Sequence, residues 1–163
     1  MALQKRFGLW LSRTAFGAWM SKVFASRVDP VIFRASGGRF TSMGPLAIPQ
    51  LVLTTRGRKS GQERDAQLAY TDLDGAIYVV ASNFGGERHP AWSHNLQAEP
   101  NAFMQLRDTR TPIRAEHLSD EEKHAVWERL CENIPNYSTY QERTTRNINV
   151  YRLSPRESDT VSA

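Results

Sequence analysis

The chain has 163 residues, of which 40% are hydrophobic and 23% are charged, and its formal net charge is +4 at pH 7. The length is that of one domain, and the composition is that of a soluble globular protein. The mild positive charge suits anionic ligands, lipid headgroups or nucleic acid alike, but no run of five like charges forms a nucleic-acid-binding tail, so we expect no nucleic-acid partner.

Residues 5–25 have the pattern of an amphipathic helix with an unusually wide apolar face that includes Trp10 and Trp19. Three interpretations remain open: a helix packed on the rest of the protein, an interfacial helix in peripheral contact with a membrane, and a signal sequence. Arg13 interrupts the apolar run, so the segment is too broken for a membrane span of about 20 apolar residues.

A shorter helix is expected at residues 31–36. Asp29-Pro30 has the pattern of an N-cap followed by proline at the first helical position, and Gly37-Gly38 has the pattern of a helix end. The glycine- and proline-containing residues 41–49 then predict a loop.

Further along the chain, short runs of β-branched and aromatic residues predict β-strands. The expected strands are Leu51–Thr55, Asp65–Thr71, Ala76–Ser82, Asn101–Asp108, Thr111–Leu118 and Asn147–Leu153. Asp74-Gly75 is a hairpin turn signal between the second and third strands, and Pro90 begins a short helix after the third. This order indicates an α+β fold built on a mostly antiparallel barrel rather than a βαβ sheet.

The C-terminal part combines helices with the last strand. Ser119 and Glu122 form a capping-box pattern at the start of an amphipathic helix, and residues 135–141 predict a further short helix or turn. Cys131 lies in the first of these helices and is the single cysteine of the sequence. A single cysteine excludes an internal disulfide and suits a reducing cytoplasm. The expected organisation is an N-terminal helical segment, residues 1–38, a barrel domain with a C-terminal helical cap, residues 39–155, and a disordered tail, residues 156–163.

The turn after the first predicted strand concentrates positive charge. It reads Arg56-Gly57-Arg58-Lys59-Ser60-Gly61, with Arg64 just beyond. If both glycines adopt positive φ, successive backbone N–H groups can form a concave nest, and the cations and the hydroxyl add donors for a phosphate or carboxylate. The alternative is a solvated hairpin turn whose cations keep a sheet end soluble. The turn is not a P-loop, because the spacing of that motif is absent.

Familiar catalytic motifs are missing from the sequence. His89, His94, His117 and His124 show no metal-ligand spacing, so we interpret them as structural or solvent-facing and expect no metal. Neither a Gly-x-Ser-x-Gly elbow nor a dinucleotide-binding fingerprint occurs. An anion site with aromatic walls but no nucleophile or metal fits a ligand-binding protein, or an enzyme whose cofactor carries the chemistry.

Four motifs in register resemble one known family. They are Thr54-Thr55-x-Gly57-Arg58-Lys59-Ser60-Gly61-x-x-Arg64, Val80-Ala81-Ser82-x-x-Gly85-Gly86, Pro90-x-Trp92-x-x-Asn95-Leu96-x-Ala98-x-Pro100 and Pro135-x-Tyr137-x-x-Tyr140-Gln141. Together they resemble the deazaflavin (coenzyme F-420)-dependent nitroreductase and quinone reductase family over roughly residues 35–155. The resemblance implies a split β-barrel related to FMN-binding barrels, the 8-hydroxy-5-deazaflavin coenzyme with its anionic tail, and hydride transfer to an electron-poor quinone, activated alkene or nitroaromatic.

The resemblance also implies residue roles. The coenzyme would be bound by Arg56, Arg58, Lys59, Ser60, Gly61, Arg64, Ala81, Ser82, Gly85, Gly86 and Trp92. The acceptor would be bound by Tyr70, Trp92, Tyr137 and Tyr140. Ser82, Tyr137 and Tyr140 would be catalytic, as groups that polarise the acceptor or relay the proton that follows the hydride, although an unperturbed tyrosine is an inefficient acid. Three positions depart from the family pattern: Gln67 and Asn149 stand where proline is common, and Asn83 replaces a lysine found in some members.

The expected protein is therefore a cytoplasmic deazaflavin-dependent oxidoreductase that acts on a small-molecule acceptor. A homodimer and a peripheral membrane contact through the N-terminal helix are further expectations. The leading alternative is a flavin- or haem-binding split barrel without this activity, and a third is a membrane-surface interaction protein.

Overall fold

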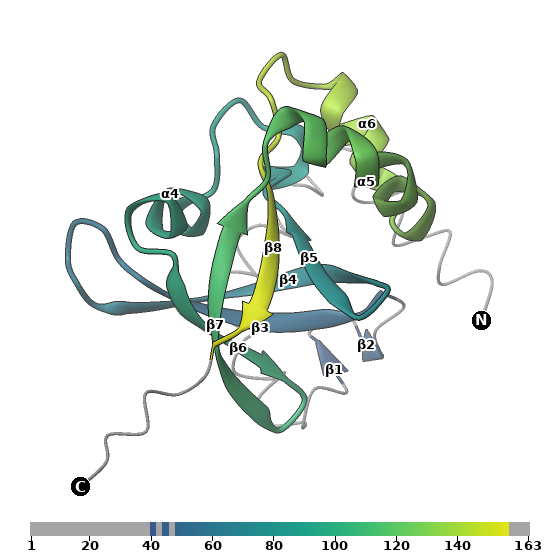
Figure 1. Cartoon of the computed structure of the whole chain (residues 1–163). Helices are drawn as coiled ribbons and strands as arrows, with labels where there is room; N and C mark the ends of the chain where they lie inside the picture. Colours follow the sequence, from purple (N-terminus) through teal and green to yellow (C-terminus); the bar gives the residue numbers. More distant parts are fainter. Residues whose placement is uncertain (1–39, 42–43, 46–47, 157–163) are drawn as a thin grey trace, which may run out of the picture.

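The computed structural model describes residues 40–41, 44–45 and 48–156 (Figure 1). The predicted amphipathic helix at residues 5–25, the short helix at residues 31–36 and the tail from residue 157 onward lie outside the described residues. A two-stranded ladder, β1 (Phe40–Thr41) and β2 (Gly44–Pro45), occupies part of the expected loop. Within the described part of the chain, no helix is both long and apolar enough to cross a membrane.

Six antiparallel strands close into a barrel in the order β3-β4-β5-β8-β7-β6. Their bounds are β3 Gln50–Arg56, β4 Glu63–Leu73, β5 Ala76–Val80, β6 Asn101–Leu106, β7 Thr109–His117 and β8 Val150–Pro155. The predicted antiparallel barrel is confirmed. Closure pairs β3 with β6, so this barrel has no unpaired sheet edge.

Local sequence explains how the strands are connected and buried. Leu51 to Thr55 of β3 are all buried, as expected for an apolar run covered on both faces. Asp74 and Gly75 both have positive φ, at 57° and 84°, which is the conformation of a two-residue hairpin turn. The predicted turn is confirmed, although β4 continues to Leu73. The last strand begins at Val150 rather than Asn147, whose side chain instead bonds Asp120.

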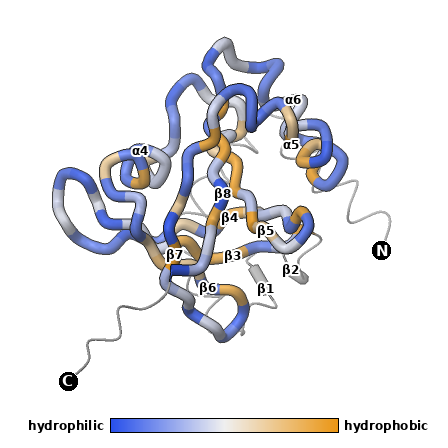
Figure 2. The backbone as a smooth tube through the Cα atoms, viewed as in Figure 1, coloured by the Kyte–Doolittle hydropathy of each residue, from blue (hydrophilic) through white to orange (hydrophobic). Residues whose placement is uncertain are grey.

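The apolar side chains form two clusters on either side of the barrel wall. One fills the barrel interior and includes Leu51, Leu53, Trp92, Ile113 and Tyr151. The other lies between the barrel and two helices, α5 (Asp120–Asn133) and α6 (Asn136–Glu142), which sit together at one end of the barrel (Figure 1). Hydrophobic colour in Figure 2 follows the strands, whereas the β3–β4 turn is hydrophilic. The predicted C-terminal helical cap is confirmed.

Two segments between β5 and β6 carry much of the candidate site. A short 3-10 turn, η1 (Asn83–Gly85), follows β5, and the helix α4 (Ala91–Ala98) follows that turn.

The predicted capping box at the start of α5 is also present: the Ser119 hydroxyl accepts from the Glu122 N–H at 3.2 Å, and the Ser119 N–H donates to the Glu122 carboxylate at 2.9 Å.

Candidate functional site

The β3–β4 turn brings the predicted basic residues together but does not form the expected backbone nest. Gly61 has a φ of +68°, whereas Gly57 is absent from the positive-φ residues of the described chain. The Gly57 N–H donates to the Gln62 carbonyl at 2.8 Å, and the Gly61 N–H donates to the Gly57 carbonyl at 2.7 Å. Because these amides close the turn on itself, anion binding here depends mainly on side chains.

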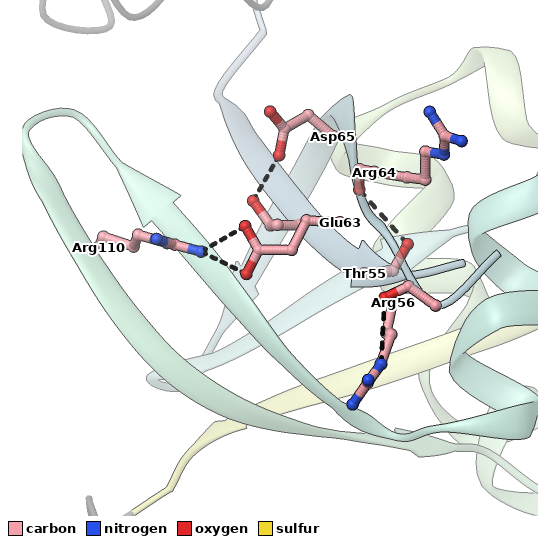
Figure 3. Close-up of polar contacts among 8 residues, drawn as sticks. Thr55, Arg56, Glu63, Arg64, Asp65 and Arg110 are labelled. Atoms are coloured by element: carbon pink, nitrogen blue, oxygen red, sulfur yellow. Dashed lines mark hydrogen bonds and ion pairs between the residues drawn. The ribbon is translucent and has the colours of Figure 1, made fainter. Parts of the chain in front are cut away.

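The cations of this turn are exposed. Arg56 donates from Nε to the Gly61 carbonyl at 3.2 Å, and Arg64 donates to the Gln62 amide oxygen at 3.1 Å. Arg58 and Lys59, together with Ser60, stand on the exposed side of the turn. Figure 3 shows the polar contacts at the base of the hairpin, where the ion pair between Arg110 of β7 and Glu63 of β4 closes at 3.3 Å.

Asn95 of α4 connects the helix to the basic turn. Its buried side chain donates from Nδ2 to the Thr55 hydroxyl at 3.0 Å and accepts at Oδ1 from the Arg58 N–H at 3.2 Å. Both ends of the amide are therefore satisfied, which fixes its orientation. Sequence reasoning placed Asn95 in a family motif but gave it no role; the structure makes it the link between α4 and the turn, which projects beside α4 (Figure 1).

A pocket of about 460 Å³ opens next to Arg58. Its other lining residues come from the η1–α4 segment and from the loop before β8: Glu87, Arg88, His89, Ala91, His94 and Arg146. Three arginines against one glutamate give the pocket a positive charge that suits an anionic ligand. Sequence reasoning identified Arg58 alone among these residues. His89 and His94, interpreted from the sequence as structural or solvent-facing, both line this pocket, and their ring centroids are 5.8 Å apart.

The segment from Ala81 to Gly86 directly precedes the pocket-lining residues Glu87, Arg88 and His89 in the chain and has an unusual backbone. Asn83, Phe84 and Gly85 all have positive φ, at 47°, 56° and 76°. A Cβ at Gly85 would lie 2.9 Å from the Tyr140 carbonyl oxygen, so glycine is needed where the segment approaches α6. The segment is fixed by this close packing and by hydrogen bonds from Arg146.

The predicted aromatic residues divide between the two apolar clusters. Trp92 is buried and its ring meets the Tyr151 ring edge-on at 5.6 Å inside the barrel, where half-buried Tyr70 also packs. Tyr137 and Tyr140 of α6 are buried in the cluster between the helical cap and the barrel. Among these four aromatic side chains, Tyr140 contacts the Ala81–Gly86 segment, through an edge-on contact of 5.8 Å with Phe84.

Burial changes the acidity of Tyr137. Removal from solvent raises the pKa of its hydroxyl well above the usual value near 10, since the phenolate is the form that burial disfavours. The hydroxyl therefore stays protonated through neutral and mildly alkaline pH. Tyr137 suits the role of a hydrogen-bond donor and is a poor proton donor.

Comparison with known proteins identifies the family. The model of the F420H(2)-dependent quinone reductase family matches residues 24–155. An F420H(2)-dependent quinone reductase of Mycobacterium tuberculosis is 35% identical over 133 residues, which cover 80% of this chain and 89% of the relative. The chain belongs to the F420H(2)-dependent quinone reductase family.

Similar solved structures share the fold. An F420-H2 dependent reductase, FDR-A, is 33% identical with a TM-score of 0.59 and aligns over 67% of this chain and 99% of its own. A structure described as a domain-swapped dimer is 32% identical with a TM-score of 0.61, over 78% and 96% of the two chains. A haem-binding protein of Mycobacterium smegmatis, at 16% identity and a TM-score of 0.50, shows the fold alone, over 68% and 47% of the two chains.

Proposed function

We propose that this protein is a deazaflavin-dependent reductase that transfers a hydride from the reduced coenzyme to a quinone. Membership of the F420H(2)-dependent quinone reductase family carries this conclusion. The exposed cations of the β3–β4 turn and the arginine-lined pocket beside them support it. Activated alkenes and nitroaromatics remain further candidate acceptors, on the basis of the sequence motifs.

The donor set fits the anionic tail of the coenzyme. Arg58 and Lys59 stand exposed on the turn, and the Arg58 backbone is held in place by Asn95. Phosphate and carboxylate groups accept charge-assisted hydrogen bonds from such side chains, each contributing about 1.5–3 kcal/mol. We assign tail binding to Arg56, Arg58, Lys59, Ser60, Gly61 and Arg64, and contact with the ring to Ala81, Ser82, Gly85, Gly86 and Trp92.

The bound coenzyme would supply the hydride, and the protein would hold donor and acceptor in contact and exclude water. The carbonyl of Ser82 is held by Arg146 at 2.6 Å, so the backbone that carries the Ser82 hydroxyl has a fixed position. We assign this hydroxyl and that of Tyr140 to the acceptor. The sequence motifs also assign Tyr70 and Trp92 to acceptor binding, and these two side chains approach from the barrel-interior cluster. Tyr137, which keeps its proton, would polarise the acceptor as a hydrogen-bond donor.

Association states are a further part of the proposal. We propose a homodimer, because a relative 32% identical over most of this chain is described as a domain-swapped dimer. We also propose peripheral membrane contact through residues 5–25, on the basis of their amphipathic pattern. A cytoplasmic location is proposed because a single cysteine suits a reducing compartment.

Parallel binding titrations test the coenzyme assignment. The purified full chain is titrated separately with the deazaflavin coenzyme, FMN and haem, and the quenching of tryptophan fluorescence gives each dissociation constant. We expect tight binding of the deazaflavin coenzyme and weaker binding of the other two ligands. Tighter binding of FMN or haem, with no affinity for the deazaflavin coenzyme, would favour the alternative of a flavin- or haem-binding barrel.

A further inference from the structure

Arg146 lies between α6 and β8, and its guanidinium contacts the Ala81–Gly86 segment from both ends. Nη2 donates to the carbonyl oxygens of Ala81 at 3.1 Å and Ser82 at 2.6 Å, and Nε donates to the carbonyl of Gly86 at 2.8 Å. These partners are 60 to 65 residues away in the sequence. A single half-buried cation therefore ties the loop before β8 to the segment that carries Ser82.

The geometry of the segment explains why such a contact is needed. Asn83 and Phe84 have the left-handed φ values that non-glycine residues rarely adopt, and such conformations persist where the surroundings enforce them. Within the segment, the Gly85 N–H donates to the Ser82 carbonyl at 2.9 Å and the Gly86 N–H donates to the Asn83 carbonyl at 3.0 Å. The guanidinium adds charge-assisted hydrogen bonds to three carbonyls at the ends of this turn, which holds the ends at a fixed separation.

The same guanidinium determines the tautomer of His89. Its Nη1 lies 3.2 Å from His89 Nδ1. A guanidinium has donors and no acceptor, so Nδ1 must accept the hydrogen bond and the ring proton must lie on Nε2. His89 lines the positive pocket and can therefore present a neutral N–H donor to a ligand there.

The charges around His89 favour this neutral state. Burial, followed by the charge of Arg146 and then by His94 of α4 and His117 of β7, lowers the pKa of His89 below its ordinary value. Arg58 of the β3–β4 turn and Arg88 add positive charge to the same pocket, and Glu87 is the one acidic side chain among the described residues that line it.

We propose that Arg146 is a positioning residue for the reaction: it holds the Ser82 backbone in place and fixes His89 as the neutral Nε2–H tautomer at the coenzyme pocket. The assignment of the pocket to the coenzyme rests on the proposed function, whereas the link between Arg146 and His89 stands on the geometry alone. Arg146 acts through Ser82 and His89.

The first test uses the full chain without coenzyme. Two-dimensional ¹H–¹⁵N NMR of the imidazole rings gives the tautomer and titration of His89 in the parent, in Arg146→Ala and in Arg146→Lys, with His89→Gln to assign the signal. We expect the Nε2–H tautomer of His89 in the parent. In Arg146→Ala we expect a mixture of the two neutral tautomers and a His89 pKa that moves up toward the ordinary 6.5. Arg152→Lys, a change at a partly exposed arginine paired with Glu116 of β7, serves as the control and should leave the His89 signal unchanged.

The second test is kinetic. Arg146→Ala should lower kcat about tenfold or more, a loss that ethylguanidinium should partly restore, with a smaller change in the coenzyme dissociation constant. Arg146→Lys, which keeps the charge and one or two hydrogen bonds, should fall between the parent and Arg146→Ala. The pH profile of Arg146→Ala should gain an ionisation that disappears in the double variant with His89→Gln.

The outcomes separate the two claims. If His89 has the same tautomer and titration in the parent and in folded Arg146→Lys and Arg146→Ala, the positioning role of Arg146 is wrong. If the NMR changes occur as expected while the parent neither binds nor oxidises the deazaflavin coenzyme, the proposed function fails and the link between Arg146 and His89 stands.

Discussion

Asn95 of α4 accepts a hydrogen bond of 3.2 Å from the backbone N–H of Arg58 in the β3–β4 turn. The same side chain donates to the hydroxyl of Thr55, at the end of β3. The basic turn is therefore attached to the helix that carries Trp92 and His94, and the cations and the pocket lining keep a defined relative position.

Asn95→Ala should disturb both stability and coenzyme binding. The change leaves the Arg58 amide without its partner and the buried Thr55 hydroxyl with the Arg64 carbonyl alone, at a cost of about 1–3 kcal/mol in the free energy of unfolding. Urea denaturation and coenzyme titration measure the two effects. Asn133→Ala, at an exposed asparagine of α5 that bonds the Arg129 carbonyl, is the control and should have little effect on coenzyme binding. Unchanged stability and binding in Asn95→Ala would remove the anchoring role.

Arg58→Ala and Lys59→Ala should each weaken coenzyme binding by about 1–3 kcal/mol at low salt, because charged hydrogen bonds to the tail are lost. The difference from the parent should shrink as the salt concentration rises. Arg129→Ala, an exposed arginine of α5 paired with Asp74 at 2.9 Å, is the matched control and should bind like the parent. Two turn variants that bind as tightly as the parent at low salt would contradict the anion site.

Tyr137→Phe and Tyr140→Phe should keep coenzyme affinity while altering turnover of the acceptor. Phenylalanine preserves the packing of each ring against the cap, including the contact of Tyr140 with Phe84, and removes the hydroxyl alone. Steady-state kinetics with a quinone, beside a coenzyme titration, measure the two quantities. Parallel losses of binding and turnover would instead make these residues part of the coenzyme site or of the folded core.

Stability should decline in alkali above the usual tyrosine pKa of 10.0. Burial raises the pKa values of Tyr137 and Tyr151, so the folded protein keeps phenol protons that the unfolded chain releases near pH 10. The stability from these groups is complete below pH 10 and is lost as pH rises through the folded-state pKa values. Urea denaturation from pH 8 upward should show a shallower loss for Tyr137→Phe than for the parent. Equal slopes would mean that Tyr137 does not resist ionisation.

The strands, hairpins and helical cap were predictable from local patterns. Local sequence preferences agree with the fold at three kinds of position. These are apolar and β-branched runs such as Leu51 to Thr55, the Asp74-Gly75 turn and the Ser119 capping box. The basic turn was predictable as a cluster of charge. Its backbone was not, because Gly57 permits positive φ without requiring it, and the amides were used to close the turn.

The rest of the candidate site depends on contacts between distant residues. Arg146 donates to the carbonyls of Ala81 and Ser82, more than 60 positions away, and the sequence around Arg146 does not indicate these partners. The left-handed φ values of Asn83 and Phe84 likewise have no local signal at phenylalanine. The sequence around His89 and His94 gave no indication that both side chains line the arginine-rich pocket.

The central claim is hydride transfer from the deazaflavin coenzyme to a quinone, and oxidation of the reduced coenzyme tests it most directly. The purified full chain is mixed anaerobically with the reduced coenzyme and a water-soluble quinone, and the return of the oxidised coenzyme absorbance is followed, with Arg58→Ala and Arg129→Ala beside the parent. The account predicts oxidation that requires both protein and quinone, is slower in Arg58→Ala at limiting coenzyme, and is unchanged in Arg129→Ala. A parent protein that binds the reduced coenzyme and leaves it unoxidised in the presence of quinones would contradict the account.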